Sequence, residues 1–445
     1  MPGGLNVGVE ILKLARLVGC EPQELAYLEL LEPQDVRDLR EQVTGVLFDA
    51  DRHMLQRVAA ASKLLPSKLA ATIGESVFGP LLCARLTGVL DPHRAVDIAS
   101  RLSTPFLADV SQDLDPRRAS RVIGELPASQ VADIAKELVR RRQYITMGNV
   151  VGHLSKAATL AALGVIDNEA LLRTAYVVES KGSLASLVAL IGEERMRTII
   201  RTAADADLWA EALDVMGHVS ERQRGELADI AAAQDDEVLE TLVAAAGRDG
   251  LWGSLLRITR AMSSVSRERF VALPSIQTEA VLAAIVQAAA DDALWADLLV
   301  FLPLLPPDGR RHVAVLAADL DEEFAAIIDA AHREELWPAL ITFAAELDEH
   351  TQARIAALIA ASDASILTGL MAAVEDAELE RESLAVIARL APEEQGPFAE
   401  RVAALASDRG LTALVEAAKA AKLDALHAGL QTVSVGSGAG AKATS

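Results

Sequence analysis

The side chains of this chain that are best suited to chemistry are carboxylates in short runs. Two acidic runs occupy corresponding places in a sequence repeat and comprise Asp235, Asp236, Glu237, Asp321, Glu322 and Glu323. Carboxylates at the start of a helix complement its dipole and cap free amides, which is one interpretation of both runs. The other is a ridge that contacts a basic protein partner or binds Mg²⁺ weakly. We expect no other cofactor, and the sequence does not identify metal ligands.

A basic run interrupts the near-neutral N-terminal half of the chain. Arg140, Arg141 and Arg142 follow Lys136 in "KELVRRRQY". One interpretation is a solvated helix end, where cations complement the dipole. The other is a contact with an acidic surface, either in the C-terminal half of this chain, in another copy or in a protein partner. A homo-oligomer therefore stays open.

The rest of the sequence shows no catalytic arrangement. The eight histidines have no paired spacing suited to a metal, and no HExxH motif or cysteine pair joins them. There is no Gly-x-Ser-x-Gly elbow. The string "GSGAGAK", residues 436–442, lacks the preceding strand and the following helix that a phosphate loop needs. We predict a protein without enzymatic activity, although catalysis by residues distant in sequence stays open.

The charge of the chain limits the classes of partner that it can bind. The net charge is −22 and uneven, because residues 1–200 carry 23 basic and 24 acidic residues whereas residues 201–445 carry 19 and 40. Such an acidic surface repels nucleic-acid phosphates and anionic headgroups and attracts basic partners or divalent cations. Solubility of an alanine-rich array is the other interpretation. We predict a basic protein partner and no nucleic acid.

Composition also bears on location. Glu10, Lys13 and Arg16 interrupt the first apolar run, which is therefore unlike a secretory leader. No uncharged apolar run has the length needed to cross a bilayer. Cys20 and Cys83 lie far apart, as is typical of a reducing compartment. We expect a cytoplasmic protein with no transmembrane segment, and the abundance of alanine and arginine favours a bacterial source.

A repeat in the sequence must position these groups. Trp209, Trp252, Trp295 and Trp337 each follow a leucine, at spacings of 43, 43 and 42 residues, a period found in helical repeat arrays. The positions i, i+4 and i+7 counted from each tryptophan define one apolar helix face, and two further apolar registers share the period. The pattern predicts units of three short helices in which each tryptophan fills the junction between units. An aromatic ladder that binds sugars or proline-rich peptides is the alternative.

A shorter period precedes the tryptophan repeat. "LDPHRAVDIASRL" from Leu90 and "LDPRRASRVIGEL" from Leu114 lie 24 residues apart, each with an aspartate as N-cap and a proline at the first helical position. Together with "LPASQVADIAKEL" from Leu126 they predict two-helix units. Over residues 86–143 these segments resemble the acidic superhelical N-terminal domain of the MgtE magnesium transporters.

This resemblance carries expectations of its own. In that family the domain is cytoplasmic, precedes paired CBS modules and five transmembrane helices, and moves as magnesium binds. The present chain shows neither the β-α pattern of a CBS module nor the membrane part. The resemblance therefore implies a Mg²⁺-responsive regulatory module and no transporter, and it identifies no metal ligand. The later 43-residue units look more like HEAT or armadillo repeats.

These patterns predict an all-α protein, a right-handed solenoid of 24-residue two-helix units followed by 43-residue three-helix units. The expected regions are an N-terminal helical cap at 1–85, MgtE-like repeats at 86–178, tryptophan repeats at 179–430 and a disordered tail at 431–445. Glu380 replaces tryptophan in a degenerate last unit. The predicted function is a non-enzymatic cytoplasmic scaffold or adaptor that holds a protein partner on an acidic surface, and the alternative is a soluble Mg²⁺-responsive module.

Overall fold

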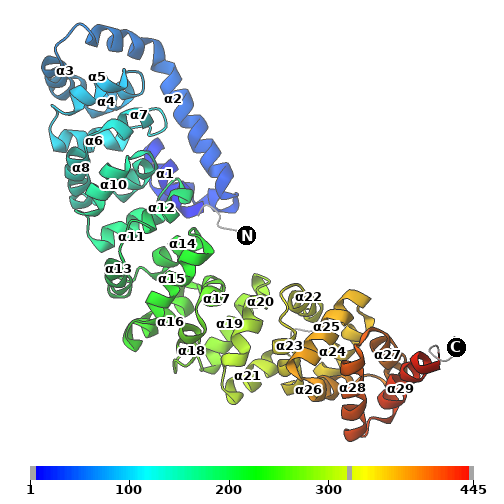
Figure 1. The fold of residues 1–445 in the computed structure, drawn as a ribbon. Helices are drawn as coiled ribbons and strands as arrows, with labels where there is room; N and C mark the ends of the chain where they lie inside the picture. The colour runs from blue at the N-terminus through cyan, green and yellow to red at the C-terminus, as the bar shows by residue number, and fades with distance from the viewer. Residues whose placement is uncertain (1–6, 318–322, 440–445) are drawn as a thin grey trace. The chain divides into compact units, whose positions relative to one another are not determined.

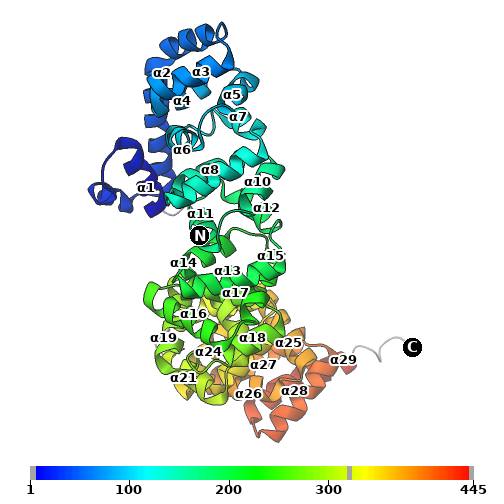
Figure 2. The same ribbon diagram turned by 90° about the vertical axis from the view of Figure 1, so that its left-hand side faces the viewer.

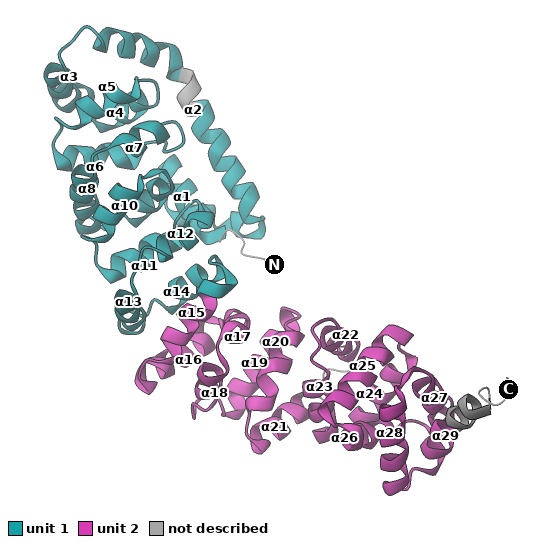
Figure 3. Cartoon of the chain, in the orientation of Figure 1, with its two compact units in different colours: residues 1–223 teal, residues 224–445 magenta. Residues whose placement is uncertain are grey.

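The fold is all-α, as predicted, and no strand occurs in the part of the chain that the structure describes. The computed structural model describes residues 7–317 and 323–439, with side chains except at 47–50, 317 and 432–439. The chain forms two compact units, unit 1 (residues 1–223) and unit 2 (residues 224–445) (Figure 3). This division falls inside the first tryptophan repeat, and the expected boundary between the two kinds of repeat at residues 178 and 179 stays a prediction.

The helices of unit 1 are α1 (Val7–Val18), η1 (Pro22–Leu30), α2 (Pro33–Ser62), α3 (Ser67–Ile73), η2 (Gly74–Phe78), α4 (Gly79–Thr87), α5 (Pro92–Ala99), α6 (Thr104–Asp113), α7 (Ser120–Glu125), α8 (Ala128–Arg140), α9 (Tyr144–Val150), η3 (Val151–His153), α10 (Lys156–Leu163), α11 (Asn168–Tyr176), η4 (Lys181–Ser183), α12 (Leu184–Val188), α13 (Glu193–Asp205) and α14 (Trp209–Gly217). The next helix, α15 (Glu221–Ala232), spans the division between the units.

In unit 1 the short helices form two rows. One row is α3, α5 and α7, the other is α4, α6, α8 and α10, and neighbours within each row pack side by side (Figures 1 and 2). Asp91 caps α5, because its side chain accepts a hydrogen bond from the backbone N–H of Arg94 at 3.2 Å. The matching prediction at Pro116 is wrong: Asp115 and Pro116 open a turn, and α7 begins only at Ser120.

The N-terminal segment of unit 1, expected as a helical cap, contains a long helix. Helical segments begin at Pro22 and Pro33. The second of them, α2, runs for 30 residues. Its C-terminal part packs on α4, where Leu55 and Leu86 are both buried.

The helices of unit 2 that follow α15 are α16 (Asp236–Asp249), α17 (Trp252–Ala261), α18 (Ser264–Val271), α19 (Glu279–Asp291), α20 (Trp295–Phe301), η5 (Leu302–Leu304), α21 (Pro307–Ala317), α22 (Phe324–Arg333), α23 (Trp337–Glu346), α24 (Glu349–Ala361), α25 (Ala364–Ala377), α26 (Glu380–Ile387), α27 (Pro392–Leu405), α28 (Asp408–Ala420) and α29 (Asp424–Ala439). Residues 431–439 of the expected disordered tail are therefore helical, and residues 440–445 lie outside the described residues.

Unit 2 repeats a set of three helices. The first helices of successive sets, α17, α20, α23 and α26, pack against one another, and each packs on the third helix of its own set (Figure 1). A long polar side chain at one position of the second helix, Arg267, Arg310, Gln352 or Gln395, donates to carbonyls at the C-terminal end of the preceding helix or turn at 2.9 to 3.3 Å. These bonds satisfy carbonyls that a helix end leaves without an internal partner. The right-handed sense of winding stays a prediction.

The third helix of each set ends in the same left-handed turn. The left-handed residues are Asp207, Gly250, Ala293, Glu335, Glu378 and Lys422, at spacings of 42 to 44 residues. The leucine that follows each one donates its backbone N–H to a carbonyl five residues earlier at 2.8 to 3.0 Å, the bond that defines a Schellman motif. The turn also follows α28, so α29 is the first helix of a further set.

Each tryptophan opens a helix directly after this turn. Trp209, Trp252, Trp295 and Trp337 are 2 to 4% exposed. Trp337 contacts the ring of His332 on the preceding set, with 6.2 Å between ring centroids, so this tryptophan lies at a junction between sets. The indole N–H groups of Trp252, Trp295 and Trp337 have no hydrogen-bond partner among the described residues. Apolar packing therefore accounts for their stabilising effect.

The left-handed turns predict opposite effects of two substitutions. A side chain at positive φ costs about 1 kcal/mol relative to glycine, and a Cβ at Gly250 (φ 68°) would meet no atom within 4 Å. Gly250→Ala should therefore lower the free energy of unfolding by about 1 kcal/mol, and Ala293→Gly (φ 54°) should raise it by a similar amount. Urea denaturation followed by circular dichroism measures both. Changes of the same sign in the two variants would contradict the assignment.

The tryptophan junctions predict a difference between two truncations. Trp295→Ala leaves a cavity and should lower the free energy of unfolding by about 3–5 kcal/mol. Trp295→Phe keeps most of the ring contacts and removes an indole N–H that is buried without a partner. The decrease in the free energy of unfolding caused by Trp295→Phe should be well under half of the decrease caused by Trp295→Ala. Denaturation curves by circular dichroism test this pair, and equal losses would contradict a role in apolar packing.

Candidate functional site

The first predicted acidic run lies at the start of α16 in unit 2. Asp235 occupies the N-cap position, Asp236 and Glu237 are in the first turn, and all three are exposed. Asp236 pairs with Arg269 at 3.0 Å, and the same guanidinium donates to the carbonyl of Gln234 at 2.6 Å. One carboxylate of this run therefore takes part in packing between neighbouring helices of the array.

The second predicted acidic run is only partly described. Asp321 and Glu322 lie outside the described residues. Glu323 is half-buried at the N-cap position of α22, where its side chain makes no capping hydrogen bond. The joint ridge of both runs therefore stays a prediction.

The predicted basic run lies at the end of α8 in unit 1, where most of its charge is used locally. Arg140 and Arg141 both pair with Glu137 at 2.7 Å, and Arg141 also pairs with Asp109 on α6. Hydrogen bonds from Arg140 and Arg141 lower the pKa of the Glu137 carboxyl to about 2. Arg142 is exposed and adopts the left-handed turn that ends α8. The run thus links neighbouring helices, and its role toward a partner stays a prediction.

A second set of carboxylates recurs at the opposite ends of the helices in unit 2. We name as the acidic turns the exposed residues at or after the C-termini of α16, α19, α22 and α25, namely Asp249, Asp291, Asp292, Glu334, Glu335, Asp376 and Glu378. They occupy the polar segments that link one set of helices to the next. Their signal in the sequence is the repeat of "GRDG", "ADDA", "HREE" and "EDAE" before each leucine.

The position of the acidic turns is electrostatically unfavourable. The C-terminal end of a helix carries partial negative charge, so a carboxylate there costs about 0.3–1 kcal/mol. Ion pairs offset this cost at two of the carboxylates: Arg257 pairs with Asp292 at 3.0 Å, and Arg260 pairs with Glu334 at 2.6 Å. Within the described part of the chain, Glu335, Asp376 and Glu378 make no ion pair. Helix stability does not explain why these carboxylates recur.

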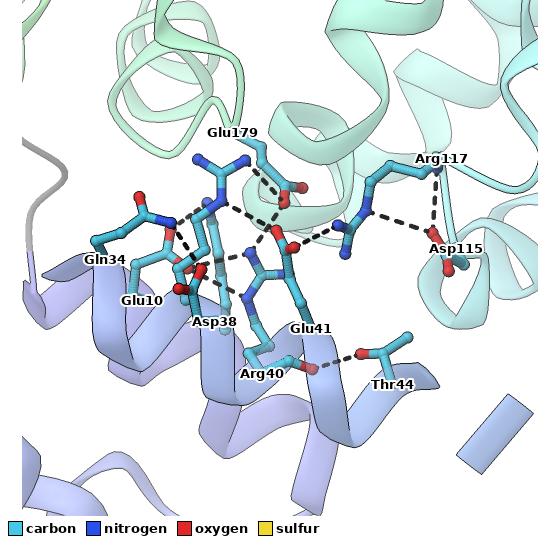
Figure 4. A network of polar contacts seen from close by, with 11 residues as sticks. Glu10, Gln34, Asp38, Arg40, Glu41, Thr44, Asp115, Arg117 and Glu179 are labelled. Carbon is cyan, nitrogen blue, oxygen red and sulfur yellow. Dashed lines mark hydrogen bonds and ion pairs between the residues drawn. The ribbon is translucent and has the colours of Figure 1, made fainter. Parts of the chain in front are cut away.

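The densest group of buried charges lies in unit 1, where α1 and α2 meet the segment before η4 (Figure 4). Glu10, Lys13 and Arg40 are 1, 4 and 8% exposed. Glu10 accepts from Lys13 and from Arg40 at 3.1 Å each, and Arg40 also reaches Glu179 at 2.9 Å. Removing one partner of a buried pair leaves an uncompensated charge, so this network fixes α1 and α2 to the helices of unit 1.

The same network extends along α2 to the turn before α7. Arg117 pairs with Glu41 at 2.7 Å (Figure 4). Glu41 also accepts from Arg37 at 3.2 Å. Burial alone would raise the pKa of the Glu179 carboxyl, but Arg40, Lys13 and Arg37 together lower it. Desolvation lowers the pKa of Lys13, although Glu10 and Glu179 oppose this change.

A polar cleft of about 310 Å³ adjoins this network in unit 1. Its charged lining consists of Lys13, Arg16, Arg40, Arg85, Arg117, Arg118, Asp113, Asp115 and Glu179. Arg16 donates to Gln112 at 3.3 Å, and no carboxylate of the described residues lies within ion-pair distance of it. Desolvation raises the pKa of Asp113. Five of the six cations of the lining pair with carboxylates, which leaves Arg16 as the cation available to an anionic group.

Sequence reasoning missed both the network and the cleft. Their members come from distant parts of the chain, since Glu10, Arg40 and Glu179 meet across as many as 139 residues. No spacing rule joins such positions. A local signal existed only in the charged residues that interrupt the first apolar run, Glu10 and Lys13.

The remaining observations concern metals and membranes. No group of three or more His, Cys, Asp or Glu side chains suited to a metal occurs among the residues that the structure describes. Among the described residues one helical segment, Ser67–Thr87, is long and apolar enough to cross a membrane; an 18-residue window of it has a mean hydropathy of 1.3 and is 22% buried. A core helix of a soluble protein meets the same criteria, so the expected absence of a transmembrane segment stays a prediction.

The fold defines the class of the chain as all-α helical-repeat proteins. No protein-family model matches the chain, and no curated protein matches it. Function therefore has to be argued from the side chains themselves.

The buried network predicts a pH-dependent effect of one substitution. Glu179→Gln leaves Arg40 with one carboxylate fewer and should lower the free energy of unfolding at pH 7 by roughly 3 kcal/mol. The pKa of Glu179 is lowered from its ordinary value of 4.5, so its stabilising effect is present above that value and is lost as pH falls through the lower, folded pKa. The difference between the two proteins should therefore shrink below pH 4.5.

Denaturation curves at pH 7 and at successively lower pH values measure this difference. Glu194→Gln, at an exposed carboxylate, is the control and should change little at either pH. A loss for Glu179→Gln that stays constant as the pH falls would contradict the role of its charge.

Proposed function

We propose that this chain is a non-enzymatic scaffold or adaptor, and that the acidic turns of unit 2 bind a basic protein partner. The observation that carries the proposal is the recurrence of exposed carboxylates at helix C-termini, where they weaken the helices that bear them. Repeat arrays present long surfaces made from corresponding positions of successive units. A row of like charges at such positions suits a partner with cations along an extended segment.

The charge of unit 2 supports the same proposal. Residues 224–445 carry 35 acidic and 17 basic residues, whereas residues 1–223 carry 29 and 25. Some of the basic residues of unit 2 pair with acidic turns, as Arg257 and Arg260 do, which leaves the carboxylates in excess. An excess of one sign steers an oppositely charged partner and raises its association rate.

The proposal predicts a localised loss of binding. An oligo-arginine peptide with a fluorescent label serves as the probe. The turn variant carries Asp291→Asn, Glu335→Gln, Asp376→Asn and Glu378→Gln, all at exposed sites. If each contact contributes about 0.4 kcal/mol, the dissociation constant should rise roughly tenfold. Fluorescence anisotropy at low and high salt measures it, and binding should weaken at high salt because exposed charges are screened.

The matched control removes the same number of charges elsewhere in unit 2. It carries Glu393→Gln, Glu394→Gln, Glu400→Gln and Asp408→Asn, which are also exposed. This control should keep most of the affinity of the native chain. Equal losses in the two variants would show attraction by net charge alone and would overturn the assignment to the acidic turns. Circular dichroism confirms that both variants keep their helices.

A further inference from the structure

Unit 1 contains a second cavity, of different chemistry from the polar cleft. This apolar cavity measures about 210 Å³ and lies among the end of α2 and the helices α3 to α7 (labelled in Figure 1). Aliphatic side chains such as Val58, Ile73, Leu86, Ile98 and Leu102 form most of its wall. No charged residue lines it.

The few polar side chains of its wall are already satisfied. The hydroxyls of Ser62, Thr87 and Ser111 each donate to a carbonyl three or four residues earlier in their own helix, at 2.7 to 2.9 Å. The Cys83 thiol contacts the carbonyl of Gly74 at 3.6 Å, and burial raises its pKa to about 11. The wall therefore presents hydrocarbon to an occupant and no free hydrogen-bonding group.

Exposed apolar side chains adjoin this cavity along the chain. Phe78 lines the cavity and is 37% exposed, so it belongs to both the wall and the surface. Leu64, Leu69 and Val77, each next to a wall residue in the sequence, are 47 to 87% exposed. Exposed apolar side chains next to an apolar cavity are suited to contact an apolar ligand.

The backbone at this place departs from the regular repeat. Gly74–Phe78 forms a π-helical turn, and Gly79 follows at φ 75°. Such turns are frequent at functional sites. A Cβ at Gly74 would lie 3.3 Å from the Cys83 sulfur, so the glycine leaves room beside the thiol. The irregular turn thus ends at Phe78, the exposed residue of the wall.

We propose that the apolar cavity of unit 1 binds a single aliphatic chain, from a free fatty acid or from a lipid, which enters beside Phe78. Apolar cavities of about 150 Å³ stay free of water and bind small hydrocarbons, so a cavity of 210 Å³ accepts part of a medium-length chain. The exposed side chains of Lys63 and Lys68, next to Leu64 and Leu69 in the sequence, suit an anionic head group outside the cavity.

Protection of Cys83 provides a readout located in the cavity wall. The full chain with Cys20→Ser retains a single thiol, Cys83, whose alkylation by N-ethylmaleimide is followed by mass spectrometry. Monomeric decanoate is the first probe, and vesicles of phosphatidylglycerol are the second. Binding in the cavity should slow the alkylation of Cys83 at least severalfold with one probe or both.

Two variants fill the cavity from α5 without adding charge. Ala95→Leu with Ala99→Leu, in the Cys20→Ser background, places larger side chains at two wall positions, and Ala99→Met is a milder version in case the first does not fold. Each should abolish the protection, and a thermal midpoint equal to that of the parent shows that the fold is kept. Leu160→Ser, at an exposed leucine outside the cavity wall, is the control and should leave the protection unchanged.

The outcomes distinguish the two possible sources of the bound aliphatic chain. Protection by decanoate supports a free fatty acid, and protection by vesicles alone supports a lipid acyl chain. No protection by either probe overturns the proposal. Protection that persists in a folded, cavity-filled variant also overturns it, because the probe then binds elsewhere.

Discussion

The structure depends on the constraint that its helices are too short to be stable alone. Most have 7 to 14 residues, and isolated helices of that length are marginal in water. Each must bury its apolar stripe against a neighbour, and the neighbour must be held at the right distance and angle. In unit 2 a Schellman turn provides this at each junction, and a buried tryptophan follows the turn at Trp252, Trp295 and Trp337. The turn reverses the chain, and the leucine and tryptophan after it enter the core at once.

This constraint explains how polar groups are used in the array. Short helices expose many ends, and each end leaves carbonyls and amides without internal partners. The arginines and glutamines at one position of the second helix donate to such carbonyls, and aspartates or serines such as Asp348 and Ser263 cap the amides. Unit 1 meets the same need with fewer regular turns and adds a buried ion-pair network that holds the long helix α2.

The sequence predicts what is local and periodic, and it fails where contacts are long-range. The leucine–tryptophan spacing predicts three helices per set because every set solves the same packing problem. The residue before each repeat leucine adopts a left-handed conformation. Among these residues only Gly250 is a glycine, the residue type that most often marks such a turn in a sequence. The prediction that a helix begins at Pro116 was wrong because an aspartate–proline pair opens a turn as readily as a helix. The network of Glu10, Arg40 and Glu179 joins positions that no period connects.

The two proposed binding surfaces lie where the chain departs from the rules that stabilise it. A π-helical turn interrupts the regular helices beside the apolar cavity, and apolar side chains such as Val77 and Phe78 face water there. The acidic turns place carboxylates at the wrong end of the helix dipole, and Glu335 and Glu378 add a left-handed backbone that favours glycine. Departures of this kind lower stability and recur at functional sites, because a ligand or a partner supplies the missing contacts. Since the two departures differ in chemistry, one exposing hydrocarbon and the other negative charge, they suit two separate ligands and not one.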